Sequence, residues 1–186
     1  MARARRRTRQ RLMPAVIADA GPLIGLSRIG RLALLCEVFG QILITPAVAA
    51  ELRITGHNSG LVAYDGQEAL AEAMVEGWLR LSEPANPGDY RPLNPGVDAG
   101  EASCIALALS LRQRGLASLL ILDDRAGRAE ARRLDLELTG TAAVVAMARL
   151  RGLIPAAGPV LHDLRSNGYF LSEATIDTVL LALSEG

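Results

Sequence analysis

Short apolar runs alternate along the chain with longer segments in which apolar side chains recur every three or four residues. The short runs are typical of β-strands, which we expect at residues 15–19, 41–45, 78–81, 118–123 and 137–139. The longer periodic segments predict helices at residues 22–29, 31–39, 46–53, 67–77, 98–114, 125–134, 142–151, 156–167 and 172–183. This alternation predicts an α/β protein with a mostly parallel sheet.

Capping and turn residues mark several boundaries of these elements. Thr45 followed by Pro46 is typical of the start of a helix, here at residues 46–53. Gly77 is typical of a helix end and closes the predicted helix at residues 67–77. The polar segment 56–66 and the proline-rich segment 83–96 predict loops, the second a possible lid. We see no linker that divides the chain, so we expect one domain over residues 14–186.

The charge distribution separates the first residues from the rest. All 20 basic residues are arginine, and residues 1–11 carry six of them without an acid. The remaining 14 arginines face 20 acids, so a basic arm (residues 1–13) precedes an acidic body. The arm could contact phosphates, or it is simply a disordered start or lies upstream of the natural initiation point.

Composition excludes several functional classes. Without lysine, the phosphate-binding loop of nucleotide hydrolases and Schiff-base chemistry are excluded, and a phosphoacceptor signalling domain is disfavoured. Six aromatic residues are too few for base stacking to be the main means of recognition.

Cysteine and histidine usage points away from zinc, disulfides and a Ser-His-Asp triad. Cys36 and Cys104 lie in apolar helical patterns and are expected to be buried in a reducing compartment. His57 and His162 are the only histidines, too few for a zinc site. Asp19 interrupts the early apolar run, so we expect no signal peptide and a soluble, cytoplasmic protein that does not bind membranes.

Carboxylates from four separate segments are candidates for one site. Asp19 ends the first predicted strand, Asp123 and Asp124 end a later one, and Glu51 and Glu101 lie in helices. Ligands bind open parallel sheets at the carboxyl ends of the strands, so these acids are expected to meet there. A group of carboxylates requires a cation, and oxygen ligands favour Mg²⁺ or Mn²⁺.

Each of these acids also has a purely structural explanation. Asp19 and Asp124 could start helices, and Glu51 could be an exposed helix residue. Asp98 and Glu101 fit a capping box, in which both side chains only close the end of a helix.

Five motifs in order resemble the PIN-domain family, in particular the small prokaryotic proteins related to VapC-type toxins. They are VIADAGPLIGLSRIGRLALL, ILITPAVAAEL, GEASCIALAL, LLILDDRAGRAEARRLDLELTGT and RLRGLIP, and the resemblance covers about residues 15–185. It implies a three-layer α/β/α sandwich and a metal-dependent ribonuclease. The catalytic acids of the family correspond here to Asp19, Glu51, Glu101, Asp123 and Asp124. The resemblance implies that Asp19, Glu101, Asp123 and Asp124 hold the metal and that Glu51 completes or orients its surroundings.

The resemblance also implies partners and shows two departures. A homodimer and a small antitoxin protein that plugs the acidic site are implied. Ala20-Gly21 replaces the Thr-Ser that many relatives carry, which removes a hydroxyl near the metal, and Ala142-Ala143 replaces Leu-Gly after the last motif strand. Neither change removes a carboxylate.

Our working hypothesis is therefore a Mg²⁺- or Mn²⁺-dependent endoribonuclease in which a metal-activated water attacks an RNA phosphodiester. Arg125 and Arg128 follow the acidic pair and are candidates for contacts with RNA phosphates. Two alternatives stay open: a catalytically idle PIN-like module for nucleic-acid binding or regulation, and a DNA nuclease, because no residue here reads a 2′-hydroxyl.

Overall fold

The computed structural model describes residues 13–54, 65–86 and 88–185. Its centre is a sheet of five strands in the order β3-β2-β1-β4-β5, all parallel to their neighbours. The strands are β1 (Ala15–Ala18), β2 (Ile42–Ile44), β3 (Leu79–Leu81), β4 (Ser118–Ile121) and β5 (Leu138–Thr139).

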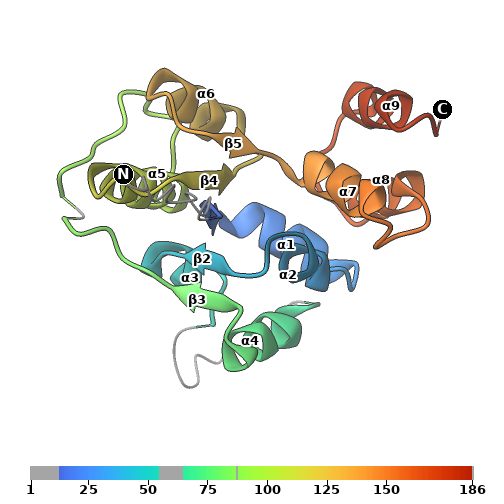
Figure 1. Cartoon of the computed structure of the whole chain (residues 1–186), viewed down its shortest axis with the longest axis horizontal. Helices are drawn as coiled ribbons and strands as arrows, with labels where there is room; N and C mark the ends of the chain where they lie inside the picture. Colours follow the sequence, from blue (N-terminus) through green and yellow to red (C-terminus); the bar gives the residue numbers. More distant parts are fainter. Residues whose placement is uncertain (1–12, 55–64, 87, 186) are drawn as a thin grey trace, which may run out of the picture.

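Helices cover both faces of this sheet, which gives the three-layer α/β/α sandwich expected from the sequence (Figure 1). One layer contains α3 (Pro46–Glu51), α5 (Ala99–Gln113) and α6 (Arg125–Arg133). The other contains α1 (Ala20–Arg28), α2 (Ala33–Phe39), α4 (Gln67–Glu76) and α7 (Thr141–Leu150). Against α7 pack α8 (Ala157–Ser166) and α9 (Glu173–Ala182).

The strand order creates a switch point in the middle of the sheet. From β1 the chain moves outward through β2 to β3, then crosses back to place β4 on the other side of β1. The loops that leave β1 and β4 therefore diverge to opposite sides, and a crevice opens at the carboxyl ends of these two strands.

The core explains why the strands are almost entirely apolar. Ile17, Ile42 and Leu120 are fully buried between the helical layers, as parallel strands covered on both faces require. Cys104 is buried with them, whereas Cys36 is only half-buried, so the expectation of burial holds fully for one cysteine. Both thiols are free.

Local signals placed the helix ends well. Thr45 caps α3 by accepting a hydrogen bond from the Val48 amide, and Gly77 ends α4 in the left-handed conformation. Each strand is shorter than expected by one or two residues. In β1 and β4 the reason is that Asp19 and Asp123 already belong to the loops that leave the sheet. The arginine-rich segment and most of the loop at 56–66 lie outside the described residues.

Candidate active site

Acids from four segments meet at the carboxyl-end edge of the sheet. Asp19 follows β1 and occupies the N-cap position of α1, while Glu51 is the last residue of α3. Asp98 and Glu101 flank the start of α5, and the pair Asp123–Asp124 follows β4. The predicted convergence is therefore present.

Gly100 lies at the point where three of these carboxylates come closest. A Cβ atom at this position would lie 3.0 Å from Asp19 Oδ1, 3.0 Å from Glu51 Oε2 and 3.3 Å from Asp98 Oδ1. Any larger residue would place a methyl group among the three carboxylates. The glycine in the first turn of α5 thus keeps the centre of the cluster open.

Glu101 reaches the same region from inside the protein. Its side chain is almost completely buried, and its Oε2 accepts a hydrogen bond from the Asp98 amide at 3.1 Å. Asp98 Oδ1 in turn accepts from the Glu101 amide at 2.8 Å, which completes the expected capping box. Gly127 of α6 makes room for this carboxylate, since a Cβ there would lie 2.3 Å from Glu101 Oε1.

Two carboxylate oxygens in the cluster are buried without a hydrogen-bond partner. These are Asp19 Oδ1 and Glu101 Oε1. Although Asp19 stands at the N-cap of α1, its side chain makes no capping hydrogen bond. A buried acceptor without a donor is costly and is rare in proteins, so these two oxygens require an explanation other than helix capping.

The electrostatics of the cluster agree with this geometry. Burial, together with the nearby carboxylates of Asp98 and Glu51, raises the pKa of Asp19 to about 7, although neighbouring backbone amides oppose the shift. Burial is also the main cause that raises the pKa of Glu101 to about 7, with Asp98, Asp124 and Asp19 adding to it. The pKa of Glu51 is raised by burial and by Asp98. The cluster therefore resists ionisation unless a positive charge joins it.

Asp123 has a different environment, set by Thr141 and Tyr169. Its Oδ2 accepts hydrogen bonds from the Thr141 hydroxyl at 2.6 Å and the Tyr169 hydroxyl at 2.5 Å. The backbone amide of Thr141 also donates to it at 3.1 Å. Burial, followed by the charge of Asp123, raises the pKa of Tyr169, so this phenol stays a donor at neutral pH.

A cavity of about 330 Å³ joins Asp123 to the rest of the site. Asp19, Asp123 and Asp124 line it together, with Tyr169 and the almost fully exposed Phe170 on the same wall. Asp124 also caps α6 by accepting from the Ala126 amide at 2.7 Å, so capping and a place in the site coexist.

The two arginines expected to contact RNA occupy different positions. Arg125 is exposed and lines the cavity beside Asp124. Arg128 is half-buried, and its Nη1 donates to the carbonyl oxygens of Leu122 at 2.7 Å and Thr139 at 3.1 Å. Arg128 thus ties the ends of β4 and β5 together, and burial is the main cause that lowers its pKa.

The residues present fit a divalent cation. Within the described ranges, no three Asp, Glu, His or Cys side chains stand ready in the geometry of a bound ion. Carboxylates at close range disfavour one another's ionised form, so an ion-free cluster is costly to hold together when charged. The two unpartnered oxygens and the all-oxygen donor set are those that Mg²⁺ or Mn²⁺ prefers.

Fold and site together define an α/β/α domain with an acidic centre at the switch point of a parallel sheet. A family model described as a PIN domain matches residues 15–185. The chain therefore belongs to the PIN-domain family, as its motifs suggested. PIN domains are generally nucleases and typically use divalent metals.

A search of curated proteins gave no match. No helix in the described part of the chain is long and apolar enough to cross a membrane.

Three residues of the site did not emerge from the sequence as functional. The capping-box pattern predicts only a helix cap at Asp98, although its spacing to Glu101 places it next to a candidate ligand. Thr141 follows the last predicted strand, and that position was the available signal. Tyr169 comes from the segment between α8 and α9, and no local pattern in the sequence connects it with Asp123.

Proposed function

We propose that this protein is a Mg²⁺- or Mn²⁺-dependent endoribonuclease and acts as the toxin of a toxin–antitoxin pair. The observation that carries the metal-dependent part is the pair of buried, unpartnered oxygens of Asp19 and Glu101. Because both lie beside further carboxylates, a divalent cation would satisfy them and neutralise the cluster at once. The toxin role, the antitoxin and a homodimer rest on the family resemblance alone.

In this proposal the acids divide into two groups. Asp19, Glu101 and Asp124 hold the cation, and Glu51 and Asp98 complete its surroundings. Asp123, fixed by Thr141 and Tyr169, lines the same cavity as Asp19 and Asp124 and would be a further ligand of the cation. A bound Mg²⁺ or Mn²⁺ supplies an acidified water and stabilises negative charge on a phosphodiester. Arg125 at the rim attracts the RNA backbone.

The test compares Mn²⁺-dependent cleavage of a mixed single-stranded RNA pool by the wild type and by Asp19→Asn and Asp123→Asn. We expect both substitutions to lower the rate at least about 100-fold, and a chelator to abolish it. Asp177→Asn, an exposed change in α9, is the matched control and should leave the rate unaltered. Mn²⁺ binding is measured in parallel by calorimetry.

Two outcomes would decide against the proposal. If RNA is not cut with either metal and both substitutions leave Mn²⁺ affinity unchanged, the acids are not a metal site and an idle binding module is the better description. If single-stranded DNA of the same sequence is cut as fast as RNA, the metal site stands but the assignment to RNA fails.

A further inference from the structure

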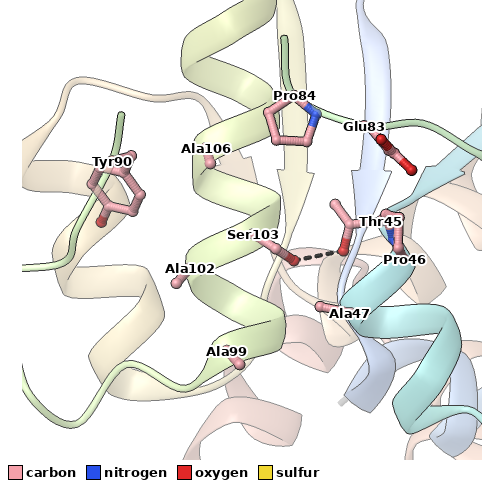
Figure 2. Close-up of a pocket in the computed structure, with 10 residues that line it drawn as sticks. All are labelled: Thr45, Pro46, Ala47, Glu83, Pro84, Tyr90, Ala99, Ala102, Ser103 and Ala106. Carbon is pink, nitrogen blue, oxygen red and sulfur yellow. Dashed lines mark hydrogen bonds between the residues drawn. The ribbon is translucent and has the colours of Figure 1, made fainter. Parts of the chain in front are cut away.

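A second hollow continues the carboxyl-end edge of the sheet beyond the acids. It lies where β2 and β3 end, since Thr45 directly follows β2 and Glu83 comes two residues after β3. Its volume is about 430 Å³, larger than the cavity at Asp123. Its walls are formed by Thr45, Pro46, Ala47, Glu83, Pro84, Tyr90, Ala99, Ala102, Ser103 and Ala106 (Figure 2).

The hollow and the acidic cluster share the first turns of α5. The side of α5 at Gly100 faces the acids, since a Cβ there would lie among their oxygens. Ala99 and Ser103, its neighbours on the helix, line the hollow. The Ser103 hydroxyl donates to the Gly100 carbonyl at 2.7 Å, so the two sites touch through a single helical turn. One turn rises about 5.4 Å, a step that one nucleotide of a bound strand can span.

The walls of the hollow are fixed before any ligand arrives. The Tyr90 hydroxyl donates to the buried Glu130 carboxylate at 3.0 Å, and the Leu93 amide donates to the same oxygen at 3.0 Å. On the other side of the loop, the Ala85 amide donates to Ser110 Oγ at 3.0 Å. The segment that carries Pro84 and Tyr90 is thus fastened to α5 and α6 at both sides of the hollow.

Two polar side chains of the hollow, those of Ser103 and Glu83, offer hydrogen-bond acceptors to a ligand. The Ser103 hydroxyl donates its hydrogen to the Gly100 carbonyl oxygen. In the 2.5 Å hydrogen bond between the Thr45 and Ser103 hydroxyls, Thr45 is therefore the donor (Figure 2). Ser103 Oγ then keeps one lone pair for a ligand, whereas Thr45 is fully buried and only holds Ser103 in place. Glu83 adds an exposed carboxylate. The rest of the wall is alanine, proline and the Tyr90 ring. Such a surface repels phosphate and suits a flat apolar group with N–H donors at its edge.

We propose that this hollow binds the base of a nucleotide next to the scissile phosphodiester, and selects adenine and cytosine, through their N6 and N4 amino groups, over uracil. Adenine and cytosine present an amino donor, whereas the corresponding position of uracil is a carbonyl acceptor, which Glu83 would repel. The small side chains of Ala102 and Ala106 leave room for the ring. The proposal rests on the proposed function, because it assumes that RNA lies along this edge.

The first test does not require catalysis. Adenosine, cytidine and uridine are titrated into the isotope-labelled full chain, and the backbone amide signals of residues 99–106 are followed by NMR. We expect adenosine and cytidine to shift these signals with at least about fivefold higher affinity than uridine. Ala102→Leu should abolish the response, and Glu83→Gln should reduce the preference over uridine. The matched controls are Ala71→Leu and Glu72→Gln on the exposed face of α4.

L-argininamide is titrated in the same way as the nucleosides. Three results would overturn the proposal: no shift with any nucleoside, equal affinity for all three nucleosides, or tighter binding of L-argininamide than of any nucleoside. The last would identify a pocket for an arginine of a partner protein.

Sequencing the cleavage sites in a random RNA pool then separates the two proposals. If the wild type cuts RNA but Glu83→Gln and Ala102→Leu leave the base preference unchanged, the nuclease stands and the base pocket fails. If the nucleosides bind as expected and RNA is not cut, the proposed function fails and the pocket stands.

Discussion

The Tyr169 hydroxyl, 46 positions along the chain from Asp123, donates a hydrogen bond that helps to orient the Asp123 carboxylate. Its ring packs on Gly25, where a Cβ would lie 2.5 Å from a ring carbon, so the ring position does not depend on the hydroxyl. We expect Tyr169→Phe to lower the free energy of unfolding by about 1–2 kcal/mol, because a hydrogen bond to a carboxylate is lost. Urea denaturation measures this, and equal stability of the two proteins would refute the role.

The sequence predicts RNA contacts for both Arg125 and Arg128, yet the contacts of the two side chains in the fold predict opposite phenotypes. Arg125→Ala should weaken binding of single-stranded RNA several-fold in low salt and leave the melting temperature unaltered, since the side chain is exposed. Arg128→Ala should lower stability by about 1–3 kcal/mol, because two strand-end carbonyls lose their donor. Filter binding measures the RNA affinity of each variant, and thermal denaturation measures its stability. A stable Arg128→Ala protein with weakened RNA binding would reverse this assignment.

At the scale of the element, the start of α5 combines helix capping with the site. Alanine is a better helix former than glycine by about 1 kcal/mol, yet the methyl group of Gly100→Ala would lie 3.0 Å from Asp19 and Glu51 oxygens. We therefore expect this variant to fold normally but to lose Mn²⁺ affinity and RNA cleavage by at least about tenfold.

Gly158→Ala is the matched control for that variant. Gly158 is likewise the second residue of a helix, and a Cβ there would only touch Leu180 at 3.5 Å. It should leave metal binding unchanged. If calorimetry shows normal Mn²⁺ affinity for Gly100→Ala, the open space at Gly100 is not where the ion binds.

At the scale of the whole molecule, the raised pKa values of Asp19 and Glu101 link stability to pH and metal. Both rise from about 4 in the unfolded chain to about 7 in the fold without metal, so between these pH values the folded state binds more protons. Stability contributed by these groups is present below pH 4 and is lost as the pH rises through 7.

Chemical unfolding in a chelator at pH 5 and pH 8 measures this loss. We expect Asp19→Asn to make the loss smaller by more than about 1 kcal/mol, because the neutral amide does not titrate. Adding Mg²⁺ at pH 8 should restore stability to the wild type and not to the variant. An identical pH dependence of wild type and variant would show that Asp19 titrates normally in the fold.

The sequence determined the elements and most of the acids of the site. Apolar runs and local caps are set by neighbouring residues, which is why Thr45, Gly77 and the Asp98–Glu101 capping box appeared where they were expected. The sheet edge followed from the parallel topology, since acids after parallel strands end at the same side. The family resemblance then selected the same five acids.

Tertiary structure alone decided how these acids differ from one another. Asp19 and Glu101 have buried oxygens without partners, whereas Asp123 is held by Thr141 and Tyr169, residues 18 and 46 positions away. Asp98 joined the cluster although its local role was a cap. Such distinctions depend on which distant side chains pack together, and that information lies in three-dimensional contacts that no local pattern of residues encodes.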